Sequence, residues 1–288
     1  MEYLLIRYAV HYTRIRQVVK SGAHRYNCGT IGRYWYLPPL SKAKEAGTLV
    51  EAVMANQEHD NYYASRKPEM LASFDEAAQR WKVILSQRYG DGFAQALLQE
   101  ARAEFEALVP AIPYIGGDEN HLTGSLIGSV RCLAFYRAMK ARSKPAAETG
   151  KVLYDAVQAH PDDYALHIPT AQRLSRDELM KRRRAGATRS QERRYAWDWV
   201  YEFVEGDGEA FDYGYDFLEC ATDKFYRAQG AGEFLPFYCF LDFLKCELDG
   251  LGLSRTTTLA EGGERCDHRF KEGARSTQAW PPPFLKTG

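Results

Sequence analysis

Two short stretches near the carboxyl end of the chain carry side chains that can do chemistry. In the first, RCDHRF at residues 265–270, a thiol and an imidazole lie two positions apart, at Cys266 and His268. If this stretch is a strand, alternation places both on one face with Phe270 and the charged residues on the other. A thiol becomes a usable nucleophile when a basic or cationic neighbour stabilises its thiolate. The stretch is therefore the first candidate for a catalytic site.

The second stretch is LPFYCFLDFLKCELDG at residues 235–250, which has the apolar spacing of a helix. Cys239 and Asp242, three positions apart, lie on a polar stripe beside the apolar one. If this helix packs on the face that carries Cys266, Asp242 can reach Cys266 or His268 and pass protons to a leaving amine. Side chains two apart on a strand are roughly 6–7 Å apart, so Asp242 or a water must link the thiol to the imidazole.

The cysteines have a simpler interpretation, because a lone cysteine is most often a small buried hydrophobic residue. Six cysteines in 288 residues are too few for a disulfide scaffold, and no CxxC pair is present. A three-thiolate metal site built from Cys220, Cys239 and Cys266 is a minor alternative, since the spacing is long and irregular. We predict no metal and no cofactor, and we prefer a functional role only for Cys266, because charged residues surround it.

The elements that must position these groups are helical in the first half of the chain. Ser73 and Glu76 have capping-box spacing and precede apolar residues at helical intervals. Further helices are predicted over 92–108 and 122–140. Residues 71–180 therefore form a helical region.

Residues 181–194 are strongly basic and show no apolar period. They are predicted to form a solvated linker, and a phosphate or nucleic-acid contact is the alternative. The stretch after Tyr201 is rich in acidic groups. If the two segments face each other, their opposite charges pair, and no polyanionic partner is needed to explain the basic segment.

Beyond the linker the apolar period changes from that of a helix to that of a strand. Aromatic residues alternate within 195–203 and 211–217, on either side of EGDGEA, which predicts an antiparallel hairpin with one aromatic face. LSRTTTLA and RCDHRFK are two further predicted strands around EGG. The fold class is therefore α+β, with a helical N-terminal half packed with a C-terminal antiparallel sheet and one or two helices. The site lies in residues 195–275, residues 71–275 form one domain, and residues 276–288 form a tail.

Composition excludes several classes of protein. Lys+Arg and Asp+Glu are equal, at 38 each, so no global charge favours a nucleic acid or a membrane as partner. No uncharged apolar run approaches the length of a membrane span, and the first residues lack the features of a signal peptide. We expect a cytoplasmic protein that acts on a small molecule. The aromatic and basic arm at residues 1–70 could exchange between subunits of a homo-oligomer.

The carboxyl-terminal third resembles the family of L-2-amino-thiazoline-4-carboxylic acid hydrolases. The likeness lies in FDYGYDFLEC, FYCFLDF and GLGLSRTTTLAEGGERCDHRFK and, more weakly, in IPYIGGDENHLTGSLIGSVRCLAFYRAMK. The family pattern has Cys and Asp three apart on a helix, then Arg-Thr…Thr-Leu-Ala…Gly-Gly, then a Cys-Asp-Phe-Arg-Phe strand. The resemblance covers roughly residues 70–272. His268 departs from it, because the family usually has Phe there, and this leaves a different substrate or an altered mechanism open.

The resemblance implies hydrolysis of a five-membered thiazoline at its C=N carbon, which gives a carbamoyl-cysteine. This reaction needs a nucleophile, a proton donor for the departing nitrogen and a cation for the substrate carboxylate. We predict Cys266 as nucleophile, or less favourably as a base toward water, Asp242 as proton shuttle, and Arg255 as a bidentate carboxylate clamp. Arg269 is the weaker clamp, because alternation places it on the face opposite Cys266.

Other residues are predicted to border this site. His268 joins the catalytic group, and Cys239 and Thr257 lie beside it. Asn120 and His121 follow the two glycines of IGGDENHL and border the pocket from the helical half. Their simpler interpretation is a capped helix start.

Three functions compete. The first is a cofactor-independent hydrolase for a small cyclic C–N substrate, acting in secondary metabolism. The second is a biosynthetic enzyme of the same fold that cyclises, isomerises or rearranges a larger apolar metabolite, which the aromatic hairpin and His268 favour. The third is a small-molecule sensing module. The effect of Cys266→Ala on turnover separates them.

Overall fold

The computed structural model describes residues 46–161 and 175–285, with side chains from residue 62 onward in these ranges. The chain divides into two compact units, Met1–Glu51 and Ala52–Gly288. Most of the predicted N-terminal arm, and with it the predicted exchange between subunits, lies outside the described residues. The last three residues of the tail also lie outside them.

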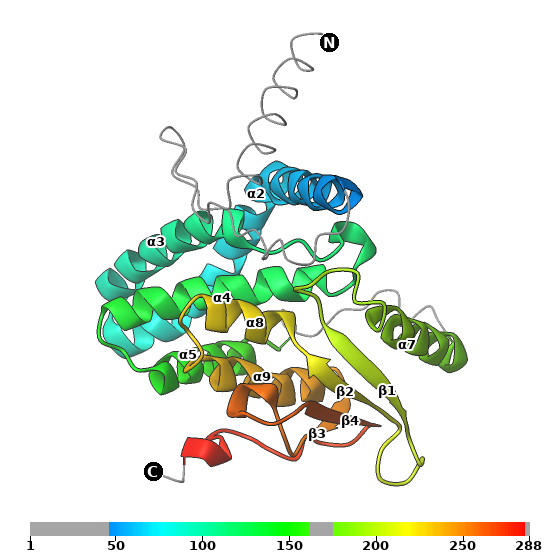
Figure 1. Ribbon diagram of the computed structural model, residues 1–288. Helices are drawn as coiled ribbons and strands as arrows, with labels where there is room; N and C mark the ends of the chain where they lie inside the picture. The colour runs from blue at the N-terminus through cyan, green and yellow to red at the C-terminus, as the bar shows by residue number, and fades with distance from the viewer. Residues whose placement is uncertain (1–45, 162–174, 286–288) are drawn as a thin grey trace. The chain divides into compact units, whose positions relative to one another are not determined.

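Long helices make up the first half of the described chain (Figure 1). Their bounds are α2 Ala46–Tyr89, α3 Asp91–Leu108, α4 Thr123–Ala141 and α5 Ala146–Ala159. The helices predicted over 92–108 and 122–140 are confirmed as α3 and α4. The predicted helix start at Ser73 is wrong, because α2 is already helical there. The Ser73 carbonyl instead accepts a hydrogen bond from Arg131 of α4, 2.9 Å away.

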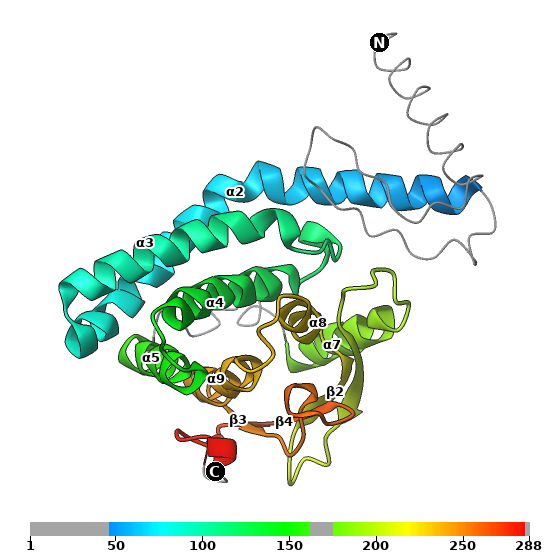
Figure 2. The ribbon, with the colours of Figure 1, turned by 60° about the vertical axis from the view of Figure 1, so that its left-hand side comes forward.

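A cluster of aromatic rings joins α2, α3 and α4. Phe74 stacks on Phe105 with ring centroids 5.4 Å apart, and Trp81 contacts both Phe74 and Phe135. All four side chains are buried. Burial of one such side chain contributes about 1.5–3 kcal/mol, so this cluster is a main source of stability for the helical layer. In Figure 2, α3 and α4 run side by side above α5.

Helix α7 occupies most of the segment predicted to be a solvated linker. It spans Arg176–Ser190 and begins with a capping box formed by Ser175 and Glu178. The linker prediction for 181–194 is therefore wrong as far as Ser190. Gly186 and Ala187 are buried, and Gly186 lies against Tyr201, where small residues let the helix approach the sheet closely.

The basic segment does face the acidic one, as predicted. Arg184 forms two hydrogen bonds with Glu205, at 2.5 and 2.7 Å. Further ion pairs join Arg176 to Asp212 and Arg193 to Glu219. These contacts pair three of the acidic groups near the hairpin with basic groups of the same chain.

The second half of the chain holds one antiparallel sheet of four strands in the order β1-β2-β4-β3. The strands are β1 Val200–Glu205, β2 Tyr213–Glu219, β3 Leu251–Ser254 and β4 Cys266–Glu272, with α8 Ala221–Ala228 and α9 Leu235–Leu248 between β2 and β3. The α+β prediction and the hairpin are confirmed. The inclusion of Tyr195 and Trp197 in the strand is wrong, because the chain turns there and β1 begins at Val200.

The register of the sheet places one aromatic row beside the candidate catalytic residues. On β2 and β4, Phe217 pairs with Cys266, Tyr215 with His268, and Tyr213 with Phe270. These six side chains share one face, which we call the inner face. Helix α9 packs on β3 at this end of the sheet, and α7 packs on β1 (Figure 2).

The predicted tail continues past β4 as a packed segment. Trp280 contacts Tyr154 of α5 and Phe237 and Phe240 of α9, with ring centroids 5.5 to 6.4 Å apart. A short 3-10 helix, η6 Pro283–Leu285, follows. The tail therefore holds α5 and α9 together as a strap.

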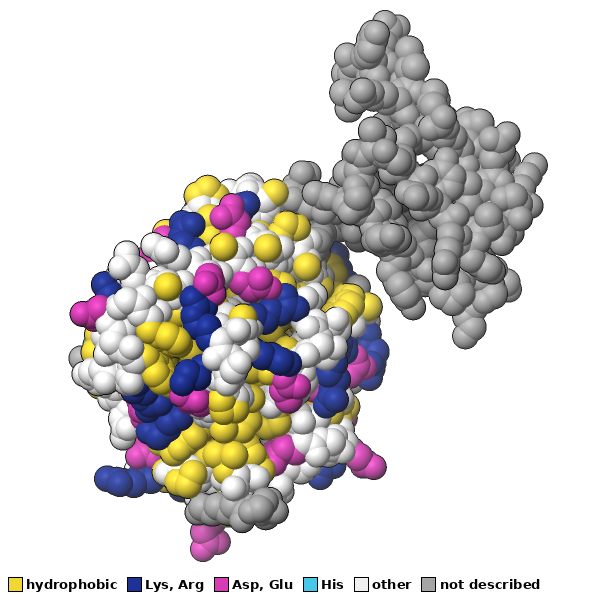
Figure 3. Space-filling model, turned by 90° about the vertical axis from the view of Figure 1, so that its left-hand side faces the viewer, with side chains coloured by type: hydrophobic (Ala, Val, Ile, Leu, Met, Phe, Trp, Pro, Cys, Tyr) yellow, Lys and Arg dark blue, Asp and Glu magenta, His cyan; other side chains and the backbone are white. Residues whose placement is uncertain are grey.

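No helix in the described part of the chain is long and apolar enough to cross a membrane. Figure 3 shows one face of the molecule, on which Lys and Arg are interspersed with Asp and Glu around apolar areas.

Candidate active site

Arg255 lies at the centre of the candidate site. It follows β3 directly, and its side chain is only 5% exposed. Its Nη1 donates to Asp242 Oδ2 at 3.3 Å, and its Nη2 donates to the carbonyl of Cys239 at 3.2 Å. The guanidinium lies 4.9 Å from the ring centroid of Phe243. Arg255 therefore joins the end of β3 to α9, and much of its donor capacity is used within the protein.

His268 extends this cluster from β4. Its Nε2 is 3.3 Å from Arg255 Nη1 and 3.8 Å from Asp242 Oδ2, and the side chain is 12% exposed. The role of Nε2 depends on the tautomer: without a hydrogen it accepts from Arg255, and with one it donates toward Asp242. Nδ1 is buried and, among the described residues, has no hydrogen-bond partner. His268 therefore has one nitrogen that a ligand could use.

Asp242 is the most accessible member of the cluster, with 39% of its side chain exposed. Burial raises the pKa of this carboxyl, but the contact with His268 and the positive charges of Arg255 and Lys245 outweigh that effect and lower it. Asp242 is therefore ionised near neutral pH and acts first as a proton acceptor.

Cys266 lies on the same face of β4, two residues before His268. The thiol is buried, and the backbone N–H of Leu259 donates to its sulfur at 3.2 Å. Burial raises the pKa of Cys266, the Leu259 amide and Arg255 lower it in part, and the negative charge of Asp242 raises it. The thiol is therefore protonated at rest.

The turn between β3 and β4 aims the Leu259 amide at this sulfur. Asp267 accepts hydrogen bonds from the backbone N–H groups of Thr256 and Thr257, at 2.9 and 2.8 Å, and from the Thr256 hydroxyl. Thr258 caps the following 3-10 helix, η5 Leu259–Glu261. At Gly263 any Cβ would lie 2.1 Å from the Thr257 hydroxyl, so only glycine fits. Thr257 thus shapes the turn.

A comparison with protein families supports the resemblance seen in the sequence. The model of the family described as L-2-amino-thiazoline-4-carboxylic acid hydrolase matches residues 126–270. The chain belongs to this family. The match runs from α4 to β4 and so contains every residue of the Arg255 cluster and Cys266. Searches of curated proteins and of solved structures gave no significant match.

In this member of the hydrolase family, some predicted site residues lie away from the cluster of Arg255, Asp242 and His268. Arg269 lies on the outer face of β4, where its Nη1 donates to Asp216 Oδ1 at 2.8 Å and to the carbonyls of Tyr215 and His268. Its side chain points away from Cys266, as strand alternation requires. The prediction of Arg269 as a substrate ligand therefore finds no support in the geometry.

Asn120 and His121 lie at the other end of the sheet, near β1. The Asn120 amide donates to the Ile115 carbonyl at 2.7 Å and to Asp198 Oδ2 at 2.8 Å, and its oxygen accepts from the Leu122 N–H. His121 is exposed and adjoins Gly186 of α7. Asn120 therefore fixes the turn before β1, which agrees with the simpler, structural interpretation of this pair.

The three thiols of the alternative metal site are Cys220, Cys239 and Cys266. Burial raises the pKa of Cys239 well above its usual range and raises that of Cys220 to about 12, and the thiols add to each other's shifts. No group of three His, Cys, Asp or Glu in the described ranges is arranged to hold a metal ion. Cys239 contributes to the cluster through its backbone carbonyl.

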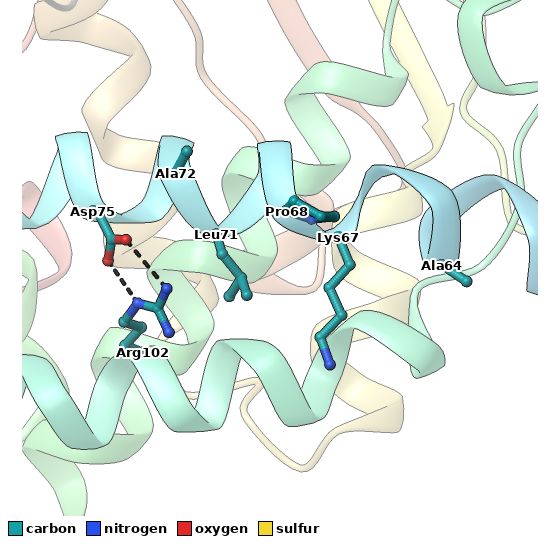
Figure 4. Close-up of a pocket in the computed structure, with 7 residues that line it drawn as sticks. All are labelled: Ala64, Lys67, Pro68, Leu71, Ala72, Asp75 and Arg102. Carbon is teal, nitrogen blue, oxygen red and sulfur yellow. Dashed lines mark hydrogen bonds and ion pairs between the residues drawn. The ribbon is translucent and has the colours of Figure 1, made fainter.

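A groove of about 540 Å³ lies elsewhere, between α2 and α3 (Figure 4). Its charged side chains already have partners: Arg102 binds Asp75, as the dashed lines show, and Lys67 pairs with Glu106. The rest of its wall is small or aliphatic. The groove lacks a nucleophile and is a poor candidate for the site.

Two groups near the site were not predicted from the sequence. The backbone N–H of Leu259 could not have been predicted, because residue type does not show where a backbone donor points. Arg183 was assigned to the linker, although it belongs to α7 and reaches the inner face. The Ser175–Glu178 spacing was the signal that could have revealed this helix.

Proposed function

We propose that the protein is a hydrolase that opens a small cyclic C–N substrate of the 2-aminothiazoline-carboxylate type by attack on its amidine carbon. Membership of the family supports this proposal at the level of reaction class. The observation that carries it is the cluster in which the Asp242 carboxylate, Arg255 and His268 meet, on the face of the sheet that also carries the buried thiol of Cys266.

In the first step of this mechanism Cys266 sulfur bonds to the amidine carbon, and the π pair of the C=N bond moves to its nitrogen. The thiol proton moves to Asp242, directly or through a water, and the backbone N–H of Leu259 stabilises the negative sulfur as it forms. Asp242 then returns the proton to the departing ring heteroatom as its bond to carbon breaks. Addition of one water and release of the Cys266 thiol leave a carbamoyl product, so substrate plus water balances the reaction.

The remaining two side chains position these groups. Arg255 is bonded to Asp242 and to the Cys239 carbonyl, so its role in this proposal changes from carboxylate clamp to holding Asp242 ionised and oriented. His268 places a polar ring where the family usually has an apolar one, and its unpartnered Nδ1 can form a hydrogen bond with the substrate. A polar ring at this position is the feature that sets this chain apart from the family pattern.

The test follows loss of L-2-amino-thiazoline-4-carboxylate and appearance of a carbamoyl-cysteine by mass spectrometry. Wild type is compared with Cys266→Ala and with Cys132→Ala, a matched loss of a thiol on α4. Removal of a nucleophile is expected to lower turnover by ~10³-fold or more, whereas Cys132→Ala retains it. Full activity in Cys266→Ala would remove Cys266 from the mechanism. Absence of turnover by the wild type would reject this substrate class.

A further inference from the structure

Arg183 of α7 lies against the inner face of the sheet. Its guanidinium carbon is 4.0 Å from the ring centroid of Tyr213, and its Nη1 donates to the Tyr215 hydroxyl at 3.4 Å. The side chain is half-buried. A cation thus lies over the aromatic row that adjoins Cys266 and His268.

Arg183 differs from Arg176 and Arg184, two other cations of α7, which pair with carboxylates. Arg184 binds Glu205 through two hydrogen bonds, and Arg176 pairs with Asp212. No carboxylate in the described part of the chain pairs with Arg183, and its Nε is buried without a hydrogen-bond partner. Burial of an unpaired charge is costly, so the guanidinium retains the capacity to bind an anion.

The Tyr215 hydroxyl adds a second donor beside this cation. Burial raises the pKa of Tyr215, with Arg183 lowering it in part, so the hydroxyl keeps its proton. Its oxygen accepts from Arg183, and its own hydrogen has no acceptor among the described side chains. A guanidinium edge and a hydroxyl together suit a carboxylate.

The position of this pair relative to the reactive cluster follows from the sheet register. Tyr215 lies opposite His268, and Phe217, two residues along, lies opposite Cys266. Adjacent strands are about 4.8 Å apart, so Tyr215 and the Cys266 cluster lie on neighbouring strands of one face. Arg255, in contrast, is already engaged by Asp242 and the Cys239 carbonyl.

We propose that Arg183, with the Tyr215 hydroxyl, binds the carboxylate of the substrate while Cys266 attacks its ring. This inference rests on the proposed function for the identity of the substrate ring. It assigns binding of the substrate carboxylate to Arg183 of α7, whereas the sequence predicted Arg255 for that role. The ligand class is a small heterocycle that carries a carboxylate.

The test measures binding by calorimetry in the Cys266→Ala background, so that turnover does not interfere. The two probes are L-2-amino-thiazoline-4-carboxylate and 2-amino-2-thiazoline, which lacks the carboxylate. The carboxylate probe is expected to bind about 10- to 100-fold tighter, as charge-assisted hydrogen bonds predict. Adding Arg183→Met should abolish this preference, and Tyr215→Phe should reduce it. Arg182→Met, an exposed cation on the same helix, is the matched control and should keep it.

Each outcome decides the inference. If Arg183→Met keeps the preference, the carboxylate binds elsewhere and the inference is overturned; failure of both probes to bind overturns it too. If the preference depends on Arg183 but wild type does not hydrolyse the carboxylate probe, the proposed reaction fails while the carboxylate site stands. If Arg183→Met does not fold, as judged by circular dichroism, Arg183→Lys is used. It keeps the charge but loses the planar fork, and an unchanged preference in it would count against the inference.

Discussion

The two faces of strand β4 differ in how fully their polar groups are satisfied. On the outer face, Asp267 accepts three hydrogen bonds from the turn before the strand, and Arg269 is held by Asp216 and two carbonyls. On the inner face, the Cys266 sulfur receives one backbone hydrogen bond, and one nitrogen of His268 has no partner among the described residues.

This difference separates structural from functional polar groups within seven residues. Buried polar groups are normally paired, and an exception asks for an explanation. The outer face needs none, because its charges shape the turn and fasten β4 to β2. On the inner face, the spare capacity of His268 and Arg183 is explained by a ligand that supplies the missing partners.

The largest predicted effect of a single change on the inner face, apart from loss of the thiol, is that of Asp242→Asn. Loss of the proton acceptor should lower turnover by about 10²- to 10⁴-fold, measured on protein shown by circular dichroism to be folded. Glu247→Gln on the same helix α9 is the matched control and should retain activity, as its carboxylate binds the backbone N–H of Ser276 instead. Steady-state kinetics measure both. Near-normal activity of Asp242→Asn would place the proton transfer elsewhere.

The outer face predicts the opposite pattern for Asp267→Ala. Loss of the hydrogen bonds to Thr256 and Thr257 should lower the free energy of unfolding by about 2 kcal/mol, measured by urea denaturation. Turnover of the folded protein should change far less than in Asp242→Asn. A large catalytic loss without a loss of stability would mean that the two faces are not separated as described.

His268→Phe restores the residue that is usual in the family pattern. The ring should fit, because His268 already lies between Phe217 and Phe270, with centroids 5.2 and 6.0 Å away. Burial raises the pKa of Asp242 and the contact with His268 is the largest opposing effect, so this pKa should rise in the variant. Activity needs the ionised carboxylate and is lost as pH falls through its pKa, so the acid limb of kcat/KM should move to higher pH. An unmoved limb would exclude Asp242 as the titrating group.

A smaller effect concerns the thiols that are not part of the inner face. Burial raises the pKa of Cys220 and of Cys246 to about 12, whereas an unfolded thiol ionises near pH 8.5. Above that pH the unfolded state loses its thiol protons first, so ionisation favours unfolding and stability falls as pH rises. Between about pH 8.5 and 9.5 the loss should be about 1 kcal/mol for each thiol. In urea denaturation at both pH values, the free energy of unfolding of Cys220→Ala should fall less with pH than that of the wild type. An equal fall would mean that ionisation of Cys220 does not contribute to the loss.

Much of the fold could be predicted because periodicity survives in single elements. α3, α4 and the aromatic hairpin have clear apolar repeats, and the predicted elements matched them. α7 was missed because it is highly charged and buries little apart from Met180, Gly186 and Ala187. The start of α2 was misplaced because the spacing of Ser73 and Glu76 mimics a cap, although Ser73 lies within the helix.

The candidate site could be predicted in part for similar reasons. Strand alternation placed Cys266 and His268 on one face, and helical spacing placed Asp242 toward it. The partners of Arg255 depend on the direction of its side chain after β3, and no local sequence pattern predicts that direction. Arg183 approaches Tyr215 from 32 positions away in the sequence, and only the packing of α7 on the sheet reveals the contact.

The most direct test of the account is a crystal structure of Cys266→Ala with L-2-amino-thiazoline-4-carboxylate bound. The account predicts the ring on the inner face of β4, with its amidine carbon next to position 266 and near Asp242, and its carboxylate at Arg183. A ligand in the groove between α2 and α3, or against the outer face at Arg269, would contradict it.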